Sequence, residues 1–251
     1  MPLENELRVL MTLGFGLLLI LLRIQAPLFG VAEYLEARPY GRPTSLWRKL
    51  SWFLIGLALL VAIWFIVPDP ADLFLVFGER SRVIVGGVAY AAIGCVVIAA
   101  LVLIRARSIV FPPLAAYPAG ILSAVGTAFL DEATFRGVLL GMLLAVGLEP
   151  LPAIVVQTLV YALATRTGAD GGDVALLVLA VGVGLLGGWL TIESGGIAAA
   201  FFGHAVSLVA LFLLTGGLMD TRPVPEAESF EDLGPSGWDE VDRRDSWPTG
   251  I

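Results

Sequence analysis

The stretch VIVGGVAYAAIGCVVIAALVLI, residues 83–104, is apolar from end to end and lies between Arg82 and Arg105. An α-helix needs about 20 consecutive apolar residues to cross the ~30 Å hydrocarbon core of a bilayer. Similar charge-free runs occur at 9–22, 51–68, 108–130, 137–148, 150–165, 174–192 and 194–219. Since ten-residue strands that alternate apolar and polar side chains are absent, the backbone must satisfy its hydrogen bonds within helices.

The composition of the whole chain points the same way. It is 58% hydrophobic and 15% charged, with a mean hydropathy of +0.90, which excludes an ordinary soluble globular domain. Joining the two runs on either side of residues 131–136 gives seven spans. We therefore expect an all-α polytopic membrane protein, with about seven transmembrane helices in a bundle around a polar intramembrane cavity.

Acidic residues gather at the C-terminal end of the chain. Residues 220–251 contain nine acidic residues, three arginines and few aliphatic residues, so this segment cannot bury a core. We expect three parts: N-terminal transmembrane helices with a cytoplasmic loop (1–114), a helical core (115–218), and an acidic, disordered cytoplasmic tail (219–251).

Lysine and arginine predict the orientation, because they are enriched in cytoplasmic loops. With seven spans, one side of the membrane receives Arg23, Arg38, Arg42, Arg48, Lys49, Arg105, Arg107, Arg166, Arg222, Arg243 and Arg244. The other side receives Arg8, Arg80 and Arg82. This asymmetry predicts an integral protein of the plasma membrane with its N-terminus outside and its C-terminus in the cytoplasm.

Three charged residues interrupt the apolar stretch TAFLDEATFRGVLLG, residues 127–141. Glu132 and Arg136 are four residues apart on one helical face and can form an ion pair, while Asp131 lies about 100° round the helix and would have the freer carboxylate. Charged side chains inside a membrane are costly, so they usually face the bundle interior and have partners. Two readings remain open: a polar site inside the membrane, or a buried clasp that fixes helix packing.

The residues around this trio resemble a known family. The stretch 131–137, Asp-Glu-Ala-Thr-Phe-Arg-Gly, is similar to the Glu-Glu-x-x-Phe-Arg-Gly signature of the CPBP family, which comprises CAAX proteases and bacteriocin-processing enzymes. The second family motif, Phe-x-x-x-His, would fall on residues 161–165, and the third, His-x-x-x-Asn, on residues 204–208. The resemblance covers roughly residues 115–215. A count of 1.5 Å per residue independently places Asp131 and His204 at nearly the same depth in the membrane, in a cavity open toward the cytoplasm.

The resemblance implies roles for individual residues. In active relatives, the first acidic residue and the second-motif histidine are thought to activate water, and the third-motif histidine and asparagine to stabilise the oxyanion. By this resemblance Asp131 is the base and His204 an oxyanion donor, while Glu132 and Arg136 orient the site. The candidate catalytic residues are Asp131, Glu132 and His204, and the candidate supporting residues are Arg136, Tyr161, Thr165, Ser207 and Leu208.

Three substitutions depart from the family pattern. Asp131 is shorter than glutamate by one methylene, and Thr165 cannot accept a proton at neutral pH as histidine can. Leu208 replaces an asparagine and removes a hydrogen-bond donor. Whether Ser207 takes over from the missing asparagine stays open.

These features predict a function class. We expect a CPBP-family intramembrane endopeptidase that hydrolyses membrane-associated peptides by a metal-independent acid–base mechanism, with weak activity or none. The alternative is a catalytically dead member that acts as a membrane binding or scaffold protein; a small transporter ranks last, because broken helices in inverted repeats are not evident. The expected partners are the bilayer and a membrane-associated peptide or protein, with no nucleic acid and no cofactor. Asp131, Glu132 and His204 are conceivable metal ligands by type, but the chain contains a single histidine and no metal site is predicted.

Overall fold

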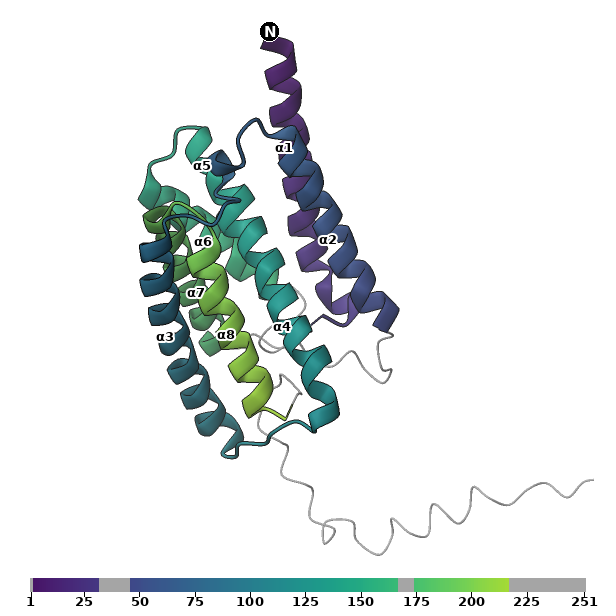
Figure 1. The fold of residues 1–251 in the computed structure, drawn as a ribbon, viewed down its shortest axis with the longest axis vertical. Coiled ribbons are helices and arrows are strands. Elements are labelled where there is room, and N and C mark those ends of the chain that lie inside the picture. The colour runs from purple at the N-terminus through teal and green to yellow at the C-terminus, as the bar shows by residue number, and fades with distance from the viewer. Residues whose placement is uncertain (1, 32–45, 167–173, 217–251) are drawn as a thin grey trace, which may run out of the picture. The chain divides into compact units, whose positions relative to one another are not determined.

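The structure is a computed structural model that describes residues 2–31, 46–166 and 174–216. Within these ranges the chain is almost entirely helical, and its β-contacts amount to one isolated bridge between Val110 and Thr215. Figure 1 shows the helices running side by side, with successive helices alternating in direction. The predicted acidic tail lies outside the described residues.

Seven helical rods make up the described part of the chain. They are α1 (Pro2–Ile24), α2 (Leu46–Ile66), α3 (Arg80–Ala106), a continuous rod formed by α4 (Tyr117–Asp131), the π-helix η4 (Glu132–Leu139) and α5 (Leu140–Ala145), and then α6 (Pro150–Arg166), α7 (Val174–Ser194) and α8 (Ala198–Leu214). Short 3₁₀ turns lie at η1 (Ala26–Phe29), η2 (Pro70–Leu73) and η3 (Leu114–Ala116). The predicted all-α fold is confirmed, whereas the proposed boundaries at 114/115 and 218/219 stay predictions.

The outer surface of these helices is apolar. Five of the rods are long and apolar enough to span a membrane, and α6 and α8 are shorter apolar helices. Large side chains such as Phe65 (83% exposed) and Ile104 (77% exposed) point away from the protein. Soluble monomers rarely expose contiguous apolar surface on this scale, so these faces fit contact with lipid tails and an integral membrane protein.

Helix α8 packs against three neighbours, α3, α4 and α7. Its contact with α3 depends on small residues: a Cβ added to Gly203 would lie 2.3 Å from the Tyr90 ring, and one added to Gly94 would overlap the Ser207 hydroxyl. Small residues let helix backbones approach closely inside membranes, where water no longer drives apolar surfaces together. This packing holds His204 on the buried side of α8.

The segment between α2 and α3 is tied to the turn between α7 and α8. The backbone N–H of Glu79 donates to the Ser194 carbonyl at 2.7 Å, and that of Ile197 donates to the Phe74 carbonyl at 3.1 Å. Gly78 adopts a φ of +89°, which favours glycine. These bonds fix the start of α8 and therefore help to set the position of His204.

Candidate functional site

Five polar side chains meet in the interior of the bundle. They come from the end of α1 (Arg23), the α4–η4 junction (Asp131 and Glu132), η4 (Arg136) and α8 (His204), and each is at most 2% exposed. Buried charges in a membrane protein need partners, since water cannot compensate them. The contacts described below supply such partners for all five.

The family-like signature lies at an irregularity of the backbone. The helix changes from α to π geometry at Glu132 and returns to α geometry at Leu140. π-Helical turns are rare, and they occur frequently at functional sites. The sequence predicts a helix here but carries no pattern that distinguishes π from α geometry, so this feature was missed.

Glu132 connects two partners from different parts of the fold. Its Oε2 lies 3.3 Å from Nε of Arg136, which confirms the ion pair predicted from the i, i+4 spacing. Its Oε1 lies 2.7 Å from Nδ1 of His204 on α8. An ionised carboxylate can only accept, so against ionised Glu132 the Nδ1 of His204 carries the proton and donates it. The sequence predicted that His204 lies near this motif, and the structure shows its Nδ1 in contact with Glu132.

Arg136 is held by two further groups. Its Nη2 donates to the backbone carbonyl of Val183 on α7 at 3.0 Å. Its Cζ lies 4.0 Å from the centroid of the Tyr161 ring, which gives a cation–π contact. Gly187 leaves room for this arrangement, because an added Cβ would lie 3.0 Å from Nε of Arg136. Tyr161 therefore supports the site through the cation–π contact between its ring and the guanidinium of Arg136.

The Tyr161 ring also packs edge-on against two other rings. Its centroid lies 5.2 Å from that of Phe135 and 6.4 Å from that of His204. Both contacts lie within the range in which aromatic pairs favour edge-to-face geometry. The imidazole of His204 is thus fixed both by Glu132 and by its aromatic surroundings.

Asp131 does not have the freer carboxylate that we expected. Nε of Arg23 lies 2.9 Å from its Oδ1, and the two side chains are 2% and 1% exposed. The assignment of Arg23 to a cytoplasmic loop was also wrong, because it lies in the last turn of α1 and is buried. A weak signal was present in the sequence: residues 24–31 carry no charge, as expected for a chain that is still close to apolar surroundings.

The three remaining predicted residues make contacts of other kinds. The hydroxyl of Thr165 donates to the carbonyl of Tyr161 at 3.0 Å, one turn earlier on its own helix. The hydroxyl of Ser207 donates in the same manner to Gly203 at 2.8 Å. Leu208 is fully buried in the hydrophobic core. The hydroxyls of Thr165 and Ser207 thus hydrogen-bond to the backbones of their own helices, and Leu208 packs in the core.

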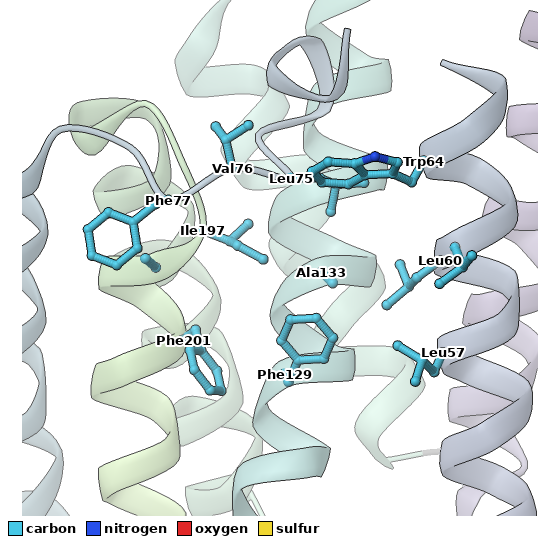
Figure 2. A pocket seen from close by; sticks show the side chains of 12 residues that line it. Leu57, Leu60, Trp64, Leu75, Val76, Phe77, Phe129, Ala133, Ile197 and Phe201 are labelled. Atoms are coloured by element: carbon cyan, nitrogen blue, oxygen red, sulfur yellow. The ribbon is translucent and has the colours of Figure 1, made fainter. Parts of the chain in front are cut away.

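The cavity also differs from our expectation. Instead of lining a polar cavity open to the cytoplasm, the charged side chains pack against one another at 0–2% exposure. Beside them lies an apolar pocket of about 420 Å³ between α2, the segment at residues 75–77, the α4–η4 junction and the start of α8. Figure 2 shows Phe129 and Phe201 on one side of this pocket and Leu57 and Leu60 on the other. Ala133, the neighbour of Glu132, forms part of its wall.

The structure gives no support for a metal centre in the part of the chain that it describes. No group of three or more histidine, cysteine, aspartate or glutamate side chains there is arranged to hold an ion. In the cluster, Glu132 contacts Arg136 and His204, while Asp131 contacts Arg23. The guanidinium groups of Arg23 and Arg136 thus lie beside these two carboxylates.

Fold and site together define a polytopic membrane protein with a charged cluster buried at a π-helical turn. Residues 113–209 match the family model described as Type II CAAX prenyl endopeptidase Rce1-like. Over these residues, fewer than half of the chain, the match supports a relation to the CPBP/CAAX protease family. It includes every predicted site residue and excludes Arg23. No curated protein and no solved structure matches the chain.

Proposed function

We propose that this chain is a CAAX-protease-family membrane protein that binds a membrane-associated peptide without hydrolysing it. The observation that carries the proposal is the Arg23–Asp131 ion pair at 2.9 Å. Asp131 stands where the family resemblance places the water-activating carboxylate. The buried guanidinium of Arg23 occupies an oxygen of this carboxylate and competes with a water molecule for it.

Two further positions support the absence of hydrolysis. Removing a general base typically lowers a rate about 10²–10⁴-fold, and removing one oxyanion donor lowers it about 10²–10³-fold. The second-motif position is Thr165, whose hydroxyl bonds to its own helix, and the third-motif position is the apolar Leu208. The chain therefore lacks the second-motif histidine and the third-motif asparagine on which the family mechanism depends. In addition, Asp131 is engaged in an ion pair.

The apolar pocket supports a binding role. It lies beside the charged cluster and shares the α4–η4 junction with it through Phe129 and Ala133. A membrane-associated peptide presents both apolar side chains and polar backbone groups. We propose that its apolar part occupies this pocket.

A second candidate function rests on the contact between Glu132 and His204. With Nδ1–H donated to Glu132 at 2.7 Å, the imidazole lone pair lies on Nε2, the arrangement by which a carboxylate orients a histidine base. In this alternative His204 is the base of a weak endopeptidase, and Glu132 is its positioning residue.

The two candidates are separated by assays on the purified full-length protein in lipid nanodiscs. Fluorogenic peptides with and without a C-terminal prenylated cysteine are tested for cleavage, and fluorescence anisotropy measures their binding. The first proposal expects saturable binding of at least one peptide, with cleavage no faster than in the Glu132→Gln and His204→Ala variants. Cleavage that the His204→Ala variant loses and the Cys95→Ala control retains would establish the second candidate instead. Absence of both binding and cleavage would contradict both.

A further inference from the structure

Arg23 is the one member of the charged cluster that lies outside residues 113–209. It belongs to the last turn of α1, and its side chain is 2% exposed. Arginine has five donors and stays charged under all ordinary conditions, so it is buried only where acceptors receive it. It forms an ion pair with Asp131, at the end of α4.

The end of α1 is fixed next to Arg23 by a second buried contact. The indole Nε1 of Trp52 on α2 donates to the carbonyl of Leu22 at 2.9 Å, and Trp52 is 1% exposed. The last carbonyls of a helix have no partner within the helix, so this bond satisfies one of them. Arg23 thus points to Asp131 from a helix end that α2 holds in place.

The charges of the cluster balance in pairs. Asp131 lies against Arg23 at 2.9 Å, and Glu132 lies against Arg136 at 3.3 Å. If Arg23 lost its charge, two adjacent carboxylates would share the single remaining arginine. Arg136 is the cation available to both, and a shift of its guanidinium toward Asp131 would weaken its hold on Glu132. Since Glu132 also contacts His204 at 2.7 Å, the change would reach the imidazole.

We propose that Arg23 is a positioning residue of the cluster. By binding the Asp131 carboxylate, Arg23 leaves Arg136 paired with Glu132. This pairing keeps Glu132 oriented toward His204. The site is therefore built from α1 as well as from the family-matched core. The proposal holds whether or not the chain hydrolyses peptides, because it concerns the arrangement of the site.

The single histidine of the chain makes the proposal testable. In protein labelled with ¹⁵N-histidine, each imidazole nitrogen signal belongs to His204, and no assignment is needed. The full-length protein in nanodiscs is compared with the Arg23→Gln, Arg23→Lys and Asp131→Asn variants. The matched control is Arg82→Gln, which removes an arginine that is 56% exposed and pairs with Glu79 and Glu193 at the protein surface.

The expected result is a clear change of the His204 signals in Arg23→Gln, near recovery of the original signals in Arg23→Lys, and no change in Arg82→Gln. Asp131→Asn should leave the His204 signals close to the original, because it removes the carboxylate that would compete with Glu132 for Arg136. If Arg23→Gln does not fold, the double variant Arg23→Gln/Asp131→Asn restores the charge balance and should fold with nearly original His204 signals. Unchanged His204 signals in a folded Arg23→Gln protein, even one with a lower melting temperature, would overturn the proposal. They would show that Arg23 stabilises the fold without positioning the cluster. Failure of the double variant to fold would overturn it as well.

Discussion

At the scale of single residues, Gly187 determines how the charged cluster is packed. Its missing side chain lets α7 approach the guanidinium of Arg136, which bonds to Val183 on the same helix and lies on the Tyr161 ring. An added Cβ would lie 3.0 Å from Nε of Arg136 and 3.4 Å from Oε2 of Glu132. Both groups are fully buried and hold each other, so neither can move without loss.

Gly187→Ala should therefore destabilise the protein. Overpacking of a filled interior costs about 1–3 kcal/mol, and the shifted guanidinium would also loosen the bond to Val183. Gly182→Ala is the matched control on the same helix, because its Cβ would meet nothing within 4 Å and alanine favours a helix by about 0.5–1 kcal/mol. Thermal unfolding in detergent should rank Gly187→Ala below the original protein and Gly182→Ala at or above it. Equal melting temperatures for the two variants would contradict this account.

The residue-level prediction from sequence succeeded for contacts within one helix. Glu132 and Arg136 are four residues apart, and that spacing alone predicts their pairing. The Arg23–Asp131 pair was beyond reach, because it joins two helices whose relative rotation depends on the packing of the whole bundle. Arg23 also lies at the edge of an apolar run, where counting rules for topology assign an arginine to a loop.

At the scale of elements, the rod from Tyr117 to Ala145 shows what hydropathy does and does not specify. The two apolar runs on either side of residues 131–136 were predicted to form one span, and the structure confirms a single rod that continues through the π-helix η4. Pairing within the cluster makes this continuity tolerable, since every charged side chain of the interruption has a buried partner. The π geometry itself depends on tertiary contacts, and periodicity could not predict it.

The joint between the segment at residues 74–79 and the turn at residues 194–197 is a second element-level feature. A Cβ on Gly196 would lie 2.4 Å from the Val76 carbonyl oxygen and 2.7 Å from the Gly78 nitrogen. Backbone atoms that are hydrogen-bonded on both sides of this joint cannot retreat as a flexible side chain can. The glycine is therefore required by close approach of the two chains.

Gly196→Ala should open this joint at a cost of about 3 kcal/mol, the upper end for overpacking. The bond from Ile197 N–H to the Phe74 carbonyl should be lost first, since Ile197 adjoins the substituted residue. Hydrogen exchange of the backbone N–H groups at residues 74–79 and 197 should then accelerate. Gly195→Asn is the control in the same turn: its φ of +70° suits asparagine, and nothing lies within 4 Å of an added Cβ. Protection that stays the same in both variants would contradict the importance of this joint.

At the scale of the whole molecule, the number of membrane-spanning rods determines whether the two ends of the described chain lie on the same side of the membrane. An odd number of spans places the first and last helix ends on opposite sides of a membrane. The seven predicted helices match the seven helical rods of the described residues, and five of these rods are long and apolar enough to span a membrane. Long apolar runs are the strongest signal available in the sequence of a membrane protein. Orientation is a separate matter. With Arg23 buried, ten basic residues remain on the proposed cytoplasmic side against three on the other, so the proposed orientation is retained.

This orientation can be tested with the chain's single cysteine replaced. In a Cys95→Ala background, Asp72→Cys introduces a thiol in the exposed segment between α2 and α3, and Ser108→Cys introduces one between α3 and α4. Helix α3 separates the two positions by 27 residues, about 40 Å at 1.5 Å per residue, so they lie on opposite sides of a bilayer. A membrane-impermeant thiol reagent should label Asp72→Cys in intact cells and Ser108→Cys only after lysis, while Cys95→Ala alone stays unlabelled. The reverse pattern would place the N-terminus in the cytoplasm, and it would mean that the positive charges of the loops do not determine the orientation of this protein.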